Sequence, residues 1–183
     1  IETAADVFDR YSFDLIYARP NQSVKDWEEE LKEALPFVRD HLSLYQLTIE
    51  KATPFYLRHQ RGEFLVPDPD PAADLYDLTQ EIMEQAGYPA YEVSNHAKTG
   101  EESRHNLLYW RYGDYLGLGP GAHGRVTHEG ARIALEAQHR PADYIDAVKE
   151  NGIGWIVETR LTPQEAADEV LLSSATKEIL PVT

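Results

Sequence analysis

The sequence predicts an α/β fold on a parallel sheet, because strand-like and helix-like segments alternate through its first hundred residues. Two segments with helical spacing separate three β-rich runs, at residues 11–17, 42–50 and 88–97. Strands joined through helices run parallel, with right-handed crossovers. Sites in such sheets lie at the carboxyl ends of strands. Here those ends are the loop after Tyr17 and the segments 47–50 and 93–97.

The first strand and helix have clear local signals. Alternating apolar residues from Phe13 to Tyr17 predict the strand, which Asp14 interrupts. Ser23 is a good N-cap, and Pro36 kinks or ends a helix whose apolar face is Val24, Trp27, Leu31, Leu35 and Val38. A carboxylate in an apolar strand needs a partner or a polar site. Asp14 therefore makes either a buried structural hydrogen bond or a ligand contact.

The second helix is predicted by its ends as well as its spacing. Asp70 is its N-cap, Pro71 takes the first helical position and Gly87 stops it. Its apolar face is Leu75, Leu78, Ile82 and Ala86. The loop before it carries the Pro/Asp run 67–71, and the strand after it ends the alternating pattern.

The alternation stops after Gly100, so we divide the chain into residues 1–100 and 101–183. A hairpin is expected around Glu129–Gly130, and a short helix between Pro141 and Gly152. Thr162, Pro163 and Glu165 form a capping box that starts a last helix.

Composition excludes several classes of function. The net charge of -15 and the lack of a basic patch argue against a nucleic-acid partner. The absence of cysteine excludes disulfides, thiolate zinc, cysteine nucleophiles and any iron–sulfur cluster held within this chain. No apolar run approaches the length of a membrane span. Nothing indicates secretion, so we expect a cytoplasmic protein, and the start at Ile1 fits a fragment or a processed product.

The segment Gly119–Gly124 formally matches the G-x-G-x-x-G pattern of dinucleotide-binding proteins. That interpretation needs a helix opening within the pattern, and the residues after Gly124 lack helical spacing. Pro120 also removes a backbone donor that would bind a pyrophosphate. We expect instead a tight loop in which glycine permits positive φ and close backbone approach.

The seven histidines do not predict a metal site, since no pair has zincin spacing and no His–carboxylate cluster stands out. Four of them are interpreted as surface or packing residues: His41, His59, His128 and His139. The dense group His105, Asn106, Tyr109 and Trp110 is different. Imidazole can bind haem iron, and Tyr and Trp can stack on a porphyrin. Alternatively the aromatic pair only packs, while His105 hydrogen-bonds to backbone.

Three stretches together resemble a known family: "FDLIYARPNQS", "LSLYQLTIEKATPF" and residues 86–125. They are similar to the oxygen-independent coproporphyrinogen III oxidase-like radical S-adenosylmethionine (SAM) proteins, most of all to the haem chaperone branch. That branch has a His-Asn-x-x-Tyr-Trp motif, which stands here at residues 105–110, and the resemblance runs from about Phe13 to about Leu171. It implies that residues 1–100 are the C-terminal part of a partial (β/α)6 TIM-like barrel. Residues 101–183 would be an α+β region carrying the motif, the Gly-rich loop and C-terminal helices.

The resemblance also implies cofactors and site residues. The family binds SAM on a [4Fe–4S] cluster, but its cysteine motif and its Gly-Gly-Glu segment do not occur in this chain. No catalytic residue is therefore assigned, and the chain alone should be inactive. The implied SAM contacts are Asp14, Thr48 and His123, and the implied haem or porphyrin contacts are His105, Asn106, Tyr109 and Trp110. Two departures are Ala18–Arg19 in place of the commoner Gly-Leu, and the divergent tail 171–183.

Three functions remain open at this point. The first is a haem-binding chaperone that delivers haem to an acceptor protein. The alternative is an oxygen-independent coproporphyrinogen III oxidase, which decarboxylates propionates to form protoporphyrinogen IX. The second alternative is an α/β interaction domain without a ligand. An open sheet edge should also invite pairing or dimerisation.

Overall fold

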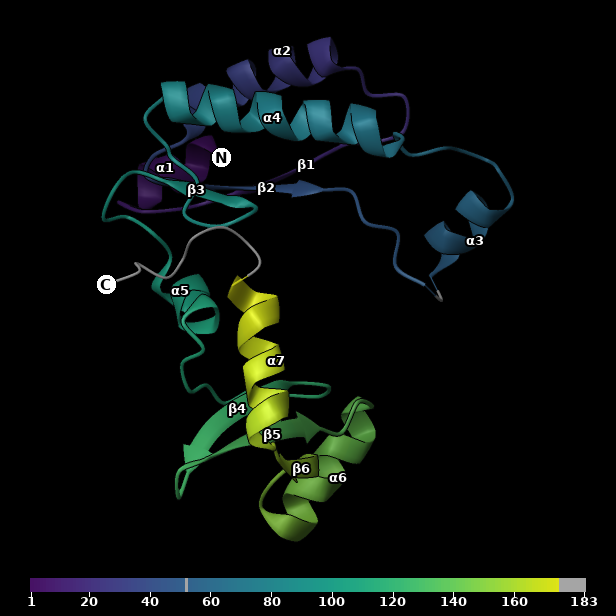
Figure 1. Ribbon diagram of the computed structural model, residues 1–183, viewed down its shortest axis with the longest axis vertical. Coiled ribbons are helices and arrows are strands. Elements are labelled where there is room, and N and C mark those ends of the chain that lie inside the picture. The colour runs from purple at the N-terminus through teal and green to yellow at the C-terminus, as the bar shows by residue number, and fades with distance from the viewer. Residues whose placement is uncertain (52, 175–183) are drawn as a thin grey trace. The chain divides into compact units, whose positions relative to one another are not determined.

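The computed structural model describes residues 1–51 and 53–174. They form two compact units, one spanning Ile1–Ser103 and one beginning at Arg104 (Figure 1). The division lies beside the boundary expected near residue 100. Each unit has its own sheet of three strands.

The sheet of the first unit has the order β1-β2-β3, formed by β1 (Asp14–Tyr17), β2 (His41–Gln46) and β3 (Asn95–Ala97). The strands β1 and β2 are parallel, with Asp14 opposite Ser43. The chain crosses from β1 to β2 through α2 (Val24–Ala34), as the strand–helix–strand pattern predicts. An α/β architecture is therefore present in this unit.

The third strand departs from the prediction of an all-parallel sheet. It has only three residues and runs antiparallel to β2, with Leu42 opposite His96. The reason is a tight turn before it, in which the Tyr91 amide donates to the Asn95 carbonyl at 3.1 Å. A bridge between Ala90 and His96 closes the same turn. The chain thus reverses direction within the predicted strand.

Two helices, α2 and α4 (Pro69–Gln85), lie side by side over one face of this sheet (Figure 1). The core between them is apolar and fully buried at Trp27, Leu31 and Met83. The Tyr17 ring stacks on Trp27 at 5.1 Å between centroids. The indole N–H of Trp27 donates to the Thr79 hydroxyl at 2.8 Å, which satisfies the one polar group of that side chain.

The helix ends follow the sequence signals with one shift. Ser23 caps α2 in a capping box with Asp26, and the helix gives way to a 3-10 turn, η1 (Leu35–Phe37), at Pro36. The predicted cap of α4 is wrong by two residues, because the helix starts after Asp68 rather than after Asp70. The run "PDPDP" offers two equivalent Asp-Pro starts. Two short helices of the first unit lack a sequence prediction: α1 (Glu2–Val7) and α3 (Pro54–Gln60).

The second unit has an antiparallel sheet of β4 (His123–His128), β5 (Ala131–Ala137) and β6 (Trp155–Arg160). The predicted hairpin is confirmed. Its two turn residues, Glu129 and Gly130, have φ values of 48° and 71°. Positive φ at both central residues is typical of a type I′ turn, whose twist matches that of the flanking strands. The strand β6 was not predicted from sequence.

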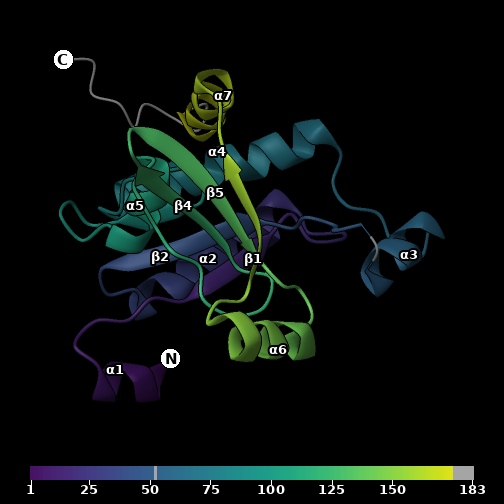
Figure 2. The same ribbon diagram turned by 90° about the horizontal axis from the view of Figure 1, so that it is seen from below.

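Up to residue 174, this unit also contains three helices: α5 (Arg104–Trp110), α6 (Pro141–Asn151) and α7 (Pro163–Ser174). The last two lie toward opposite ends of β5 (Figure 2), and β6 connects them. The predicted stop of α6 at Gly152 and the capping box of α7 are both confirmed. In α7, Glu169 accepts from Arg125 at 2.8 Å and from the Tyr112 hydroxyl at 2.6 Å, which ties the helix to β4.

The divergent tail lies mostly outside the described residues, which end at position 174. Among the residues that the structure does describe, no helix combines the length and the apolar character that crossing a bilayer requires.

Candidate functional site

The Gly-rich loop is a close backbone crossing, as predicted. A β-carbon on Gly117 would lie 2.1 Å from the carbonyl oxygen of His123, so no larger residue fits there. Gly119 and Gly121 have φ values of 104° and 70°, which favour glycine. A strand, β4, follows the loop instead of a helix. The dinucleotide-binding interpretation is therefore excluded.

The motif residues lie on a helix, which the sequence had not indicated for this stretch. Residues 104–110 form α5, a helix of seven residues whose polar, aromatic and apolar side chains lie on different sides. At about 100° per residue, His105 and Tyr109 share one side of α5. Asn106 and Trp110 share the neighbouring side by the same spacing. The helix thus brings the four motif residues onto about half of its circumference.

His105 and Tyr109 are in direct contact. Their rings meet edge to face at 4.8 Å between centroids, and Tyr109 meets Tyr115 in the same manner at 4.5 Å. His105 is exposed, and within the described part of the chain its ring makes no hydrogen bond to backbone. An exposed imidazole beside aromatic rings can bind the iron of a flat macrocycle, whose face the rings then contact.

Two of the three proposed SAM contacts, Asp14 and Thr48, lie apart on the first sheet. Asp14 is exposed at the first position of β1, whereas Thr48 follows the carboxyl end of β2. Because Asp14 is opposite Ser43, about 16 Å of strand separates it from Thr48 along the sheet. The exposure of Asp14 contradicts the buried structural hydrogen bond considered for it. His123 belongs to the second unit and is exposed at the start of β4.

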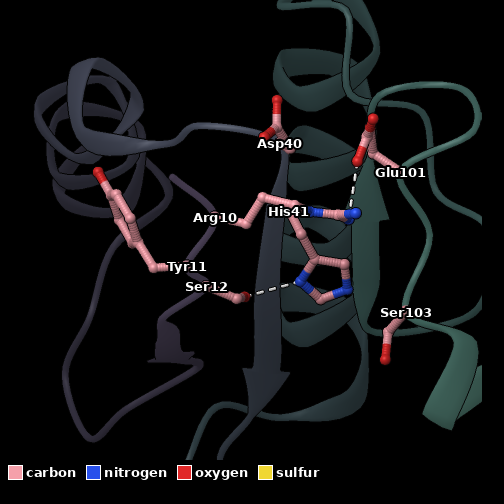
Figure 3. A pocket seen from close by; sticks show the side chains of 7 residues that line it. All are labelled: Arg10, Tyr11, Ser12, Asp40, His41, Glu101 and Ser103. Carbon is pink, nitrogen blue, oxygen red and sulfur yellow. Dashed lines mark hydrogen bonds and ion pairs between the residues drawn. The ribbon is translucent and has the colours of Figure 1, made fainter. Parts of the chain in front are cut away.

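A pocket in the first unit has no counterpart among the predicted sites (Figure 3). It has a volume of about 250 Å³ and lies at the amino ends of β1 and β2, and its lining consists of Arg10, Tyr11, Ser12, Asp40, His41, Glu101 and Ser103. Arg10 pairs with Glu101 at 2.7 Å. Lys98 pairs with Asp40 at 3.1 Å. The charged groups of this pocket are therefore paired within the unit.

His41 is the centre of a hydrogen-bond network beside this pocket. Its Nδ1 lies 2.7 Å from the Ser12 hydroxyl and its Nε2 lies 2.7 Å from the Tyr91 hydroxyl. Burial of the ring lowers the pKa of His41, while the nearby Asp14 carboxylate opposes that shift. A neutral imidazole can donate through one nitrogen and accept through the other. The interpretation of His41 as a packing residue is confirmed.

The other histidines assigned to the surface or to packing behave accordingly. His59 stacks on Phe64 at 5.7 Å, and His139 pairs with Glu136 at 2.6 Å near the surface. His128 ends β4 in an exposed position. Among the residues that the structure describes, no group of three or more His, Cys, Asp or Glu side chains is arranged to hold a metal ion.

Comparison with known proteins shows clear sequence relatives, although no protein-family model matches the chain. The mitochondrial radical S-adenosyl methionine domain-containing protein 1 of Mus musculus is 41% identical over 166 residues, which are 88% of this chain and 38% of that protein. The heme chaperone HemW of Bacillus subtilis is 35% identical over 162 residues, covering 88% of this chain and 42% of the chaperone. The chain thus spans about two fifths of the length of these relatives.

A solved structure matches as well. The coproporphyrinogen III oxidase HemN of Escherichia coli, described as a radical SAM enzyme, aligns with a TM-score of 0.70 and 21% identity. The alignment covers 94% of this chain and 42% of that one. At this identity the likeness shows the fold alone.

The fold is therefore that of part of the HemN chain, with one strand–helix–strand unit and a following α+β region. The sequence relatives identify the class of protein. The chain belongs to the radical SAM family that contains the domain-containing protein 1 of animals and the heme chaperone HemW of bacteria.

Proposed function

We propose that this chain is the part of a HemW-like haem chaperone that carries its tetrapyrrole-binding helix. The observation that supports the proposal is the exposed imidazole of His105, edge to face with Tyr109 on α5. His105 would be the axial ligand of haem iron, and Tyr109 would contact the macrocycle. Asn106 and Trp110, on the adjacent side of α5, would complete the site.

The test is a haem titration of the chain, followed through the Soret band. The wild type should bind haem, and His105→Ala should weaken binding at least about tenfold, which is about 1.4 kcal/mol. His128→Ala is a matched control, since His128 is also exposed and belongs to the same unit but lies outside the motif. An affinity that is the same in wild type and His105→Ala would refute the assignment.

For the whole protein we propose SAM bound on a [4Fe–4S] cluster, as the family's name indicates. The cluster ligands lie outside this sequence, which has no cysteine. Asp14, Thr48 and His123 remain proposed SAM contacts, acting by hydrogen bonding. The separation of Asp14 and Thr48 requires an extended ligand that reaches from one residue to the other along the sheet.

The oxidase alternative has a separate test. The fold of HemN is shared, but fold alone does not transfer a reaction. Supplied anaerobically with coproporphyrinogen III, SAM and a reductant, this chain should form no protoporphyrinogen IX, because it cannot hold the cluster. Detectable product would overturn that argument. An acceptor protein for haem, a dimer and a cytoplasmic location remain predictions.

A further inference from the structure

A second surface of α5 carries chemistry that the motif does not include. Arg104, Leu107, Leu108 and Arg111 line a shallow pocket of about 200 Å³. Their spacing of three, four and seven residues places them on one side of the helix. That side faces away from Asn106 and Trp110. Leu108 lies at its edge, next to the side of the helix that carries His105. The helix continues to Arg111, whose amide donates to the Leu107 carbonyl at 2.9 Å.

Neither arginine is held by a polar contact with another residue that the structure describes. Within the described residues, the guanidinium groups of Arg104 and Arg111 make no ion pair and no hydrogen bond. The acidic residues nearest in sequence have other partners. Glu101 pairs with Arg10 at 2.7 Å, and Glu102 accepts from the Gly100 amide at 3.1 Å. Asp114 accepts from the Thr127 hydroxyl at 2.9 Å. Among the described residues, these two cations thus have no anionic partner, although the net charge of the chain is -15.

Helix stability does not explain Arg104 either. It is the first residue of α5, where the unsatisfied amides of the helix carry partial positive charge. A cation there is slightly unfavourable, and an acidic residue would be the stabilising choice. Binding of a ligand therefore explains an arginine at position 104 better than stabilisation of the helix does.

The surface fits an amphipathic dianion. Seven residues of helix separate Arg104 from Arg111 by about 10 Å, with two leucines between them. An apolar ligand with two carboxylates would lie on Leu107 and Leu108, with one carboxylate at each arginine. Arginine is the side chain best suited to carboxylates, because its planar group can donate two parallel hydrogen bonds.

We infer that Arg104 and Arg111 bind the two propionate carboxylates of the tetrapyrrole whose iron His105 ligates. This inference rests on the proposed function and adds its carboxylate contacts. Leu108, 37% exposed, lies between the side of His105 and the arginines, so the edge of one macrocycle can cover it. The long arginine side chains reach around the helix to the carboxylates.

The experiment compares two ligands that differ only at the carboxylates. Iron protoporphyrin IX and its dimethyl ester are titrated into the 183-residue chain, both from the same organic stock and in the same dilute detergent. The wild type should bind the free acid about tenfold more tightly than the ester. In Arg104→Gln/Arg111→Gln that preference should vanish, because only the acid loses a partner.

Controls separate this inference from the proposed function. Arg140→Gln/Lys149→Gln removes two exposed cations from the same unit and should keep the preference for the acid. If the glutamine variant does not fold, Arg104→Lys/Arg111→Lys keeps the charges and should show a reduced preference. An unchanged preference in the folded arginine variants would overturn the propionate contacts alone. Failure of the wild type to bind either porphyrin would overturn the proposed function as well.

Discussion

The two candidate sites differ in how their polar groups are satisfied. In the pocket of the first unit, His41 is bonded at both nitrogens, and Arg10 and Asp40 have partners of opposite charge. On α5 of the second unit, His105, Arg104 and Arg111 are exposed and lack such partners among the described residues. A satisfied network stabilises the fold, whereas unsatisfied groups on a surface are available to a ligand. The contrast indicates a structural role for the first site and is consistent with the ligand-binding role that we propose for the second.

The largest expected effect on stability is in the core under the first sheet. Leu31 is fully buried between α2 and α4. Leu31→Ala should lower the free energy of unfolding by about 2–5 kcal/mol, through lost burial and the cavity that remains. Urea denaturation measures this change. Leu118→Ala is the control, since Leu118 is 89% exposed and its loss should stay within about 0.5 kcal/mol. Equal losses in the two variants would contradict the placement of the core.

A smaller effect distinguishes the two histidines. His41→Ala removes the partner of the Ser12 and Tyr91 hydroxyls and should cost about 1–3 kcal/mol of unfolding free energy. His105→Ala should change it by no more than about 0.5 kcal/mol, because the ring is exposed. Chemical denaturation of both variants gives the comparison. A greater loss from His105→Ala than from His41→Ala would reverse the assignment of roles.

The smallest expected effect is the pH dependence that His41 causes. Its pKa in the folded chain lies below the ordinary value of 6.5, because burial disfavours the charged ring. The unfolded chain then binds the proton more readily, so stability should be complete above pH 6.5 and should fall as the pH drops toward the folded pKa. His41→Gln should remove this part of the pH dependence while other groups titrate as before. A wild-type stability that rises on acidification through this range would contradict the sign.

Local signals in the sequence predicted the ends of elements well. The Ser23 cap, the turn at Glu129–Gly130 and the Thr162 capping box are each set by a few neighbouring residues, and all three occur in the structure. The direction of β3 was not predictable in this manner, because side-chain alternation is the same in parallel and antiparallel strands. The start of α4 was ambiguous because two successive Asp-Pro pairs give the same local signal.

In the candidate sites too, local sequence predicts some features and misses others. Once α5 is known to be a helix, the contact of His105 with Tyr109 follows from their spacing of four residues. The helix itself was missed because it is short and has no single apolar side. The His41 network joins residues 29 and 50 positions away, so no local spacing reveals it.

The contrast between His41 and His105 can be tested directly by nuclear magnetic resonance of the chain with ¹⁵N-labelled histidine. Zinc protoporphyrin IX is a suitable diamagnetic probe, since zinc accepts imidazole nitrogen as a ligand. On its addition the ring nitrogens of His105 should shift strongly, while those of His41 remain unchanged. A spectrum in which His105 is unaffected, or in which His41 shifts instead, would contradict the assignment of α5 as the tetrapyrrole-binding element.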